Sequence, residues 1–511
     1  MFLGLDSSTQ SLSALVIDPS SGEIVREVSI NFGADLPAYK SPSGFIPGGK
    51  NGEVHADPRM WMEAIDLVFG KLADGFDLGE IEAVACSGQQ HGSLYFDETL
   101  EQRLATLKAA ESLEGQLSGA LTRATAPIWM DTSTGAECAE IAAAAGGNAE
   151  VCRLSGSVAI ERFTGPQIRR FFKQDPEAYG KTAVIHLVSS FVGSVLAGKS
   201  IAIDHGDGAG MNLLNLQSLD WDDTLLDATA PGLRAKLPPA AAGTTIAGFI
   251  SDYFVEKYGI SRDCQVVLST GDNPSSLVGM GATAPGTIVI SLGTSDTFFA
   301  AMEKPVTDPQ GFGHVFGNPA GGFMSLICFR NGSLSREALR DELGLDWSAF
   351  DRDGLAKTPA GNEGKLMLPF FGPEITPRRD FDGPVRNFPA DAPAPEQVRA
   401  LLEGQFLNMR LHSQWIGEKA ELIRLTGGAS QNDGIAQLIA DIFQAPVERF
   451  AIANGAGLGA ALRAAHACGC DLTHLQGIFC KPAAGSRLEP TTSTAATYES
   501  ALDGFKSLLS A

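Results

Sequence analysis

Three short apolar stretches of the chain each end in a cluster of small and polar residues. With their polar ends, these stretches are residues 3–11, 264–273 and 288–297. Short apolar runs bounded by Gly, Ser, Thr and Asp are typical of buried β-strands. The sequence therefore predicts three strands that deliver polar groups to the edge of a sheet, where open α/β proteins place their ligands.

The stretches 3–11 and 288–297 both run into a turn of Gly, Ser and Thr. Such turns expose backbone N–H groups and hydroxyls, the donors that an oligophosphate needs. Apolar residues resume after each turn, at 12–16 and 298–299, which favours a β-hairpin over a strand-helix P-loop. Either turn alone could be an ordinary hairpin turn. Their similarity suggests two related half-molecules that face each other across a nucleotide.

The remainder of the first half alternates strand and helix signals. Asp57 and Pro58 are typical of a helix start, and apolar residues follow at helical spacing over 61–72. A strand is expected at 81–86 and a long helix around 185–196. This alternation predicts an α/β architecture.

The second half repeats the plan of the first. Ala-Pro-Gly at 284–286 directly precedes the second hairpin and marks the expected boundary, which gives domains of residues 1–284 and 285–511. A strand is expected at 422–425, and a helix with an apolar face follows over 435–442.

Composition narrows the classes of function. The chain has 511 residues, enough for two to four domains, and 38 basic against 60 acidic residues give a net charge of −22. This balance argues against nucleic acid and anionic membranes as partners, although oriented amides and a metal ion still allow phosphate binding. With no signal peptide, no long apolar segment and eight scattered cysteines, we expect a cytoplasmic protein with reduced thiols.

Two glycine-rich motifs are rejected as nucleotide sites. Residues 44–50 fit most of a Walker A pattern, but Asn51 stands where the Mg²⁺-binding Ser or Thr belongs, and we expect a mobile loop. Residues 455–460 resemble a dinucleotide fingerprint but lie near the C-terminus. The small residues there are expected to permit close helix packing.

Polar residues at other strand ends are candidates for recognising a ligand. Gln90, His91 and Asp131 follow strands of the first half, as Asp272 and Asn273 do. A lone His is more often a structural residue, but several polar groups at neighbouring strand ends could recognise a polyhydroxylated substrate. A surface ion pair with Glu161 is the simplest explanation for Arg162.

A pair of glycines follows the strand expected at 422–425. Because Gly427 and Gly428 have no Cβ, a flat ring could approach their backbone. An ordinary glycine-rich turn between strand and helix explains the pair equally well.

The ordered set of motifs resembles the FGGY carbohydrate kinases, which belong to the actin, hexokinase and Hsp70 ATPase superfold. The motifs that carry this resemblance are residues 6–10, 271–273, 291–295 and 426–430. A second set resembles the D-xylulose kinases within the family, at residues 87–92, 129–131, 161–165 and 207–212. The resemblance covers nearly the whole chain. It implies two actin-like (ribonuclease H-like) α/β lobes with an interlobe cleft, the first for the sugar and the second for the nucleotide.

The resemblance also implies residue roles. Asp272 matches the general base that takes a proton from the sugar hydroxyl, and Asp6 the residue that orients Mg²⁺ through water. The residues implied to bind the ketose are His91, Arg162, Asp272 and Asn273, with Gln90 and Asp131 as further candidates from their positions. Those implied to hold ATP are Ser8, Thr9, Gly293, Thr294, Ser295, Trp347, Gly427, Gly428 and Asn432. Relatives often carry His or another polar residue where this chain has Gln431, which leaves the contacts there open.

The implied reaction is the ATP-dependent phosphorylation of D-xylulose to D-xylulose 5-phosphate, with hinge closure between the lobes and, as is usual among relatives, a homodimer. Other ketoses or polyols such as ribulose, gluconate or glycerol are alternative substrates, because specificity among them depends on hydrogen-bond geometry. An Hsp70-like ATPase switch is a further alternative, which predicts ATPase activity indifferent to sugars. A catalytically idle sugar-binding relative is disfavoured by Asp272.

Overall fold

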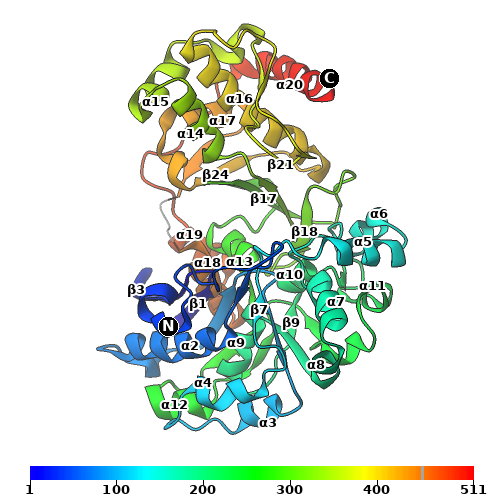
Figure 1. The fold of residues 1–511 in the computed structure, drawn as a ribbon. Coiled ribbons are helices and arrows are strands. Elements are labelled where there is room, and N and C mark those ends of the chain that lie inside the picture. Colours follow the sequence, from blue (N-terminus) through cyan, green and yellow to red (C-terminus); the bar gives the residue numbers. More distant parts are fainter. Residues whose placement is uncertain (451–453) are drawn as a thin grey trace. The chain divides into compact units, whose positions relative to one another are not determined.

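The computed structural model describes residues 1–450 and 454–511 (Figure 1). The chain forms two compact units. Unit 1 comprises Met1–Gly281, Val315–Met324 and Asn454–Cys480, and unit 2 comprises Ala282–His314, Ser325–Ala453 and Lys481–Ala511. The first change of unit lies close to the expected boundary after residue 284. Segments 315–324 and 454–480 were expected in the second domain, but they belong to unit 1.

The sheet of unit 1 is built around a central strand. β1 (Phe2–Ser7) pairs antiparallel with β2 (Ser11–Asp18), which pairs antiparallel with β3 (Glu23–Asn31). On its other side β1 runs parallel to β5 (Ala83–Gly88). The sheet then continues through β14 (Gln265–Val267) and β13 (Ile246–Phe249), while β15 (Thr270–Gly271) extends the parallel pairing along β5.

The sheet of unit 2 repeats this pattern. Its central strand β16 (Thr287–Leu292) pairs antiparallel with β17 (Asp296–Met302) and parallel with β24 (Leu422–Thr426). β19 (Phe323–Phe329) lies beyond β17, and β25 (Val447–Arg449) runs parallel to β24. Both predicted hairpins and the predicted repetition of the plan are confirmed.

Helices cover the sheets of each unit. Those of eight or more residues in unit 1 include α2 (Pro58–Ala73), α5 (Gly135–Ala144), α6 (Asn148–Ser155), α7 (Thr164–Gln174), α9 (Val188–Ala197), α13 (Asp272–Gly279), α18 (Gly455–Ala467) and α19 (Leu472–Phe479). Those in unit 2 include α14 (Ser333–Glu342), α15 (Trp347–Ala356), α16 (Ala394–Ser413), α17 (Asp433–Phe443) and α20 (Ala495–Ser510).

Local signals predicted some of these elements better than others. The start of α2 is confirmed, because Asp57 accepts a hydrogen bond from the Arg59 N–H and Pro58 is the first helical residue. The long helix expected at 185–196 is wrong in its first turn. Residues Val184–Leu187 form β8, which pairs with β6 (Ser93–Phe96) before α9 begins. A short apolar run suits a buried strand or a buried helix equally, and here the pairing with β6 decides.

The small residues of α18 permit close packing in unit 1, as predicted. A Cβ on Gly4 of β1 would lie 2.1 Å from the Gly457 carbonyl oxygen, and one on Gly459 would lie 1.9 Å from the Ser275 carbonyl oxygen. Figure 1 shows α18 and α13 side by side. This packing fixes α13, whose first residue is Asp272.

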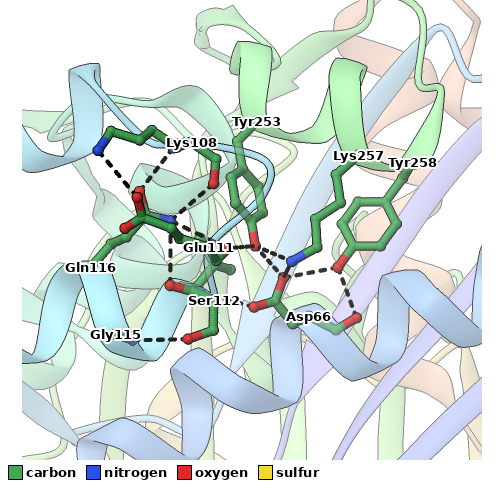
Figure 2. A network of polar contacts seen from close by, with 10 residues as sticks. Asp66, Lys108, Glu111, Ser112, Gly115, Gln116, Tyr253, Lys257 and Tyr258 are labelled. Atoms are coloured by element: carbon green, nitrogen blue, oxygen red, sulfur yellow. Dashed lines mark hydrogen bonds and ion pairs between the residues drawn. The ribbon is translucent and has the colours of Figure 1, made fainter.

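A polar network far from the strand ends ties together three helices of unit 1 (Figure 2). Asp66 of α2 accepts hydrogen bonds from Tyr253 and Tyr258 and forms an ion pair with Lys257 at 2.9 Å, all from the segment around α12 (Asp252–Tyr258). Its other carboxylate oxygen accepts the N–H of Leu113 at the start of α4 (Leu113–Leu117). A single carboxylate therefore connects three chain segments that are distant in sequence.

No helix in the described ranges 1–450 and 454–511 is both long and apolar enough to cross a membrane.

Candidate active site

Three strand ends of unit 1 lie next to one another. The register pairs Asp6 of β1 with Ser87 of β5, and Thr270 and Gly271 of β15 with Ser87 and Gly88. The chain leaves β15 directly into α13, so Asp272 stands at the same edge of the sheet as Asp6. The tertiary structure thus brings together two carboxylates that are far apart in sequence.

Asp6 is a buried carboxylate with little to compensate its charge. It is 8% exposed and accepts a hydrogen bond of 2.6 Å from the Ser87 hydroxyl. Burial raises the pKa of Asp6 to about 6, against the opposing effect of that hydrogen bond. No salt bridge joins Asp6 to a basic side chain in the part of the chain that the structure describes. Such a group is suited to face a cation from solution.

Asp272 has the properties of a general base that works near neutral pH. Desolvation and, to a smaller extent, the charge of Asp6 raise the pKa of Asp272 to about 7, against the opposing effect of a 2.8 Å hydrogen bond from the Asn273 N–H. The Asn273 amide donates to Asp272 Oδ1 at 3.1 Å and to Gln90 Oε1 at 2.9 Å. Asn273 thereby holds Asp272 and Gln90 in one cluster.

His91 is held as a neutral imidazole. Its backbone adopts a left-handed conformation with φ of 70°, its Nδ1–H donates to the Gly210 carbonyl at 2.7 Å, and its ring stacks on Phe163 at 4.2 Å between centroids. Burial lowers the pKa of His91 to about 3, and the positive charge of Arg162 lowers it too. Because Nδ1 carries the proton, Nε2 is left as an acceptor for a hydroxyl. The Arg162 guanidinium lies 5.6 Å from the Phe163 ring centre.

Asp131 is saturated by contacts within the protein. It is fully buried and accepts hydrogen bonds from the Val54 N–H, from the Ser133 N–H and hydroxyl, and from the Gln167 amide. Burial alone would raise its pKa, but these bonds together with His55 hold the pKa of Asp131 below its ordinary value. The structure therefore shows Asp131 as an anchor for the backbone at residues 54 and 133.

Two side chains near the cluster were not among the residues singled out from the sequence. Trp129 is 44% exposed, and its indole N–H donates to the Thr9 hydroxyl at 2.8 Å. Asp207 is buried and accepts a hydrogen bond from Ser189, and a Cβ on Gly271 would lie 3.0 Å from its Oδ1. Burial raises the pKa of Asp207 well above its ordinary value. Both lie in motifs that resemble the D-xylulose kinases, which was the one available signal.

The turn between β16 and β17, residues 293–295, is the one that the sequence predicts to bind phosphate in unit 2. Its residues Thr294 and Ser295 are both exposed. Gly427, which follows β24, has a φ of 87°, and a Cβ there would lie 2.3 Å from the Leu292 carbonyl oxygen. Only glycine allows the loop after β24 to lie this close to the end of β16. The structure thus brings the glycine pair and the turn 293–295 to neighbouring strand ends.

The other two residues expected to border the nucleotide have separate local roles. Asn432 caps α17, since its side-chain oxygen accepts the Ile435 N–H at 3.1 Å. Trp347 begins α15, is 41% exposed, and lies beneath the Arg340 guanidinium at 4.4 Å. α15 packs against α17, which places both residues on one pair of helices.

No group of three or more His, Cys, Asp or Glu side chains that could hold a metal ion occurs among the described residues. Asp6 supplies one carboxylate, a ligand type that fits Mg²⁺ when water and substrate phosphates supply the rest.

Comparisons with known proteins show the family of this chain. Residues 120–279 match the N-terminal domain of the FGGY family of carbohydrate kinases, and residues 288–468 match its C-terminal domain. The chain is 40% identical to xylulose kinase 2 of Arabidopsis thaliana over 92% of its own length and 88% of the relative's. It is 41% identical to the xylulose kinase of Rattus norvegicus, over 91% and 88% of the two chains.

The fold also matches a solved structure. The ligand-bound xylulose kinase of Lactobacillus acidophilus superposes with a TM-score of 0.82 at 22% identity, covering 99% of this chain and 97% of the other. The mixed α/β architecture of two related sheets is thus shared with a solved kinase, and the chain belongs to the FGGY family of carbohydrate kinases.

Proposed function

We propose that this carbohydrate kinase phosphorylates D-xylulose on its 5-hydroxyl, with ATP as the phosphoryl donor, to give D-xylulose 5-phosphate and ADP. The observation that carries the proposal is the cluster of Asp272, Asn273, Gln90 and Asp6 at one sheet edge. The choice of sugar is supported by relatives at 40% and 41% identity that are named xylulose kinases.

In the proposed reaction Asp272 accepts the proton of the 5-hydroxyl. The freed oxygen attacks the γ-phosphorus of ATP, the bond from that phosphorus to the β,γ-bridging oxygen breaks, and ADP leaves with the electron pair. A pKa of about 7 leaves a large fraction of Asp272 ionised at neutral pH while keeping it a strong enough base. Phosphoryl transfer otherwise requires mainly positioning and stabilisation of charge.

The sugar is proposed to lie against the groups that surround Asp272. Asn273 and Gln90 present amides, His91 presents an unprotonated Nε2, and Arg162 presents a cation. Neutral His91 accepts a hydrogen bond from a hydroxyl without adding charge near the base. Gln90 Nε2 is buried and has no hydrogen-bond partner among the described residues, so a sugar oxygen can complete its bonding after a small side-chain movement.

The residues proposed to bind ATP belong to two turns, one in each unit. Ser8 and Thr9 of unit 1 and Thr294 and Ser295 of unit 2 supply hydroxyls, and Gly427, Gly428, Asn432 and Trp347 border the adenosine. Mg²⁺, when bound, would neutralise phosphate charge, and Asp6 would hold it through water. The uncompensated carboxylate of Asp6 supports this assignment.

A coupled assay of ADP release over a panel of pentuloses, hexuloses, gluconate and glycerol tests the proposal. We expect D-xylulose to give the highest kcat/KM, and ADP release without sugar to be slow. A higher kcat/KM for ribulose, gluconate or glycerol would show that this sugar or polyol is the preferred substrate of the same phosphoryl transfer. ADP release that is indifferent to every sugar would instead indicate an ATPase switch.

The proposal also includes a cytoplasmic location and a homodimer. Light scattering on the purified protein tests the second point, and a mass equal to one chain at micromolar concentration would contradict it.

A further inference from the structure

We propose that Arg336 is a positioning residue for the nucleotide phosphates. It acts through Asp296 and fixes the turn Gly293–Ser295 so that Thr294 and Ser295, and not Gly293, present donors to the phosphates. This inference rests on the proposed phosphate-binding role of that turn. Asp296, Arg336 and Gln405 are called the brace below.

The brace lies directly behind the turn and is buried. The side chains of Arg336 and Asp296 are 2% and 1% exposed. Arg336 approaches both carboxylate oxygens of Asp296 at 3.2 Å, a two-point contact that fixes the carboxylate plane. Arg336 also donates to the Ser333 hydroxyl at 3.1 Å.

Both backbone polar groups of Gly293 are occupied by the protein itself. Its N–H donates to Asp296 Oδ1 at 3.1 Å, and its carbonyl accepts the Ser333 N–H at 3.0 Å and Arg336 at 3.5 Å. The Gly293 amide is therefore not free to bind a phosphate. The next two residues, Thr294 and Ser295, are exposed and carry two hydroxyls. The donors for a phosphate are thus assigned to these two.

Contacts from α16 and from residues 331–332 hold the brace in one conformation. Gln405 Oε1 accepts from Arg336 at 3.0 Å, and its Nε2 donates to the carbonyls of Asn331 and Gly332 at 2.7 and 2.9 Å. A Cβ on Gly332 would lie 2.6 Å from Asp296 Oδ1. These contacts hold the Asp296 carboxylate in place, and they preorganise the turn for the nucleotide.

The pair is better explained by positioning than by stability alone. A buried ion pair must repay the desolvation of both charges, and an apolar pair of similar volume is often as stable. Burial raises the pKa of Asp296, and Arg336 opposes that rise. The carboxylate does what an apolar side chain could not, which is to accept the Gly293 N–H.

The test compares two buried ion pairs of unit 2. Arg336→Met removes the brace, while Arg399→Met breaks the pair of Arg399 and Glu403 on α16, at 3.0 Å, which does not touch the turn. We expect Arg336→Met to raise KM for ATP by about tenfold or more with the KM for sugar nearly unchanged, because small displacements of a positioned group are costly. Arg336→Lys should lie between the parent and Arg336→Met, since an ammonium cannot make the two-point contact. Arg399→Met should leave both KM values unchanged.

Equal losses of ATP affinity in Arg336→Met and Arg399→Met, or equal rises in both KM values, would overturn the inference in favour of a purely structural pair. If Arg336→Met does not fold, the double variant Asp296→Asn with Arg336→Gln removes both charges and keeps a polar group at each position. It should fold and still show weakened ATP binding, and parental affinity there would equally overturn the inference. Calorimetric titration with ADP measures the same effect without turnover. A parent protein that binds ADP but phosphorylates no sugar would refute the proposed function and leave this comparison intact.

Discussion

The hairpin β1–β2 of unit 1 and the hairpin β16–β17 of unit 2 have the same strand neighbours but different surroundings. In unit 1 the turn is held by hydrogen bonds within itself, from the Ser8 N–H and hydroxyl to Ser11. A further hydrogen bond comes from outside the turn, where the Trp129 indole N–H donates to the Thr9 hydroxyl. In unit 2 the turn is held from behind by Asp296 and Arg336.

The difference lies in which groups compensate the carboxylates at the strand ends. Asp296 has an arginine partner, whereas Asp6 has a serine and Asp272 has backbone and amide groups. Desolvation raises the pKa of Asp6 to about 6 and, together with the charge of Asp6, that of Asp272 to about 7, while Arg336 opposes the rise that burial causes at Asp296. We therefore propose that the same sheet pattern serves proton chemistry in unit 1 and a fixed phosphate-binding turn in unit 2.

The largest expected effect is at Asp272. Asp272→Asn should lower kcat by about 10²–10⁴-fold, because the variant has no base for the sugar hydroxyl, with ADP affinity nearly unchanged. The parent should also lose activity as the pH falls below about 7, where Asp272 becomes protonated. Steady-state rates from pH 5 to pH 9 measure both. A variant that retains most of the parental kcat would refute the assigned base.

The next largest effect is expected on stability, at Asp296, whose carboxylate pairs with Arg336. Asp296→Asn leaves Arg336 buried without its charge partner, and we expect the free energy of unfolding to fall by about 3–5 kcal/mol. Urea denaturation monitored by circular dichroism measures it. A change below about 1 kcal/mol would mean that the brace contributes little to the fold.

Removing the charge of Asp6 should have the opposite effect, which is to raise the free energy of unfolding. The folded pKa of Asp6, about 6, lies above the ordinary value of 3.8, so ionising it as the pH rises from 4 through 6 destabilises the parent. Asp6→Asn cannot ionise and should be more stable than the parent at pH 8 by about 1–3 kcal/mol, with the gap closing towards pH 4. Melting temperatures without nucleotide or Mg²⁺ across this range give the measurement. A gap that is constant with pH would contradict the unpaired state of Asp6.

The smallest effect serves as a control away from both hairpins. Asp66→Asn weakens the ion pair with Lys257 and the bonds from Tyr253 and Tyr258 (Figure 2), and we expect a loss of about 1–2 kcal/mol in stability. Both KM values and kcat should stay at parental levels at a temperature where the variant is folded. A selective rise in one KM would show that the network reaches the site.

Particular residues show how far the sequence could be interpreted. The two hairpins, the start of α2 and the close packing of α18 follow from local patterns of apolar, capping and small residues. The helix expected from residue 185 failed in its first turn because β6 supplied a strand partner that no local signal shows. The anchoring of Asp131 and the contact of Trp129 with Thr9 depend on loops far away in sequence.

The sequence by itself determined the order of strands and turns, the repeated half-molecule and the positions where carboxylates leave strands. Those features depend on neighbours a few residues apart, through alternation, capping and the freedom of glycine. Only the tertiary structure decided that the side-chain partner of Asp6 is Ser87 while that of Asp296 is Arg336, and that segments 315–324 and 454–480 belong to unit 1. Burial and charge pairing depend on groups that meet only after folding, and it is these that set whether a carboxylate holds a proton or fixes a turn.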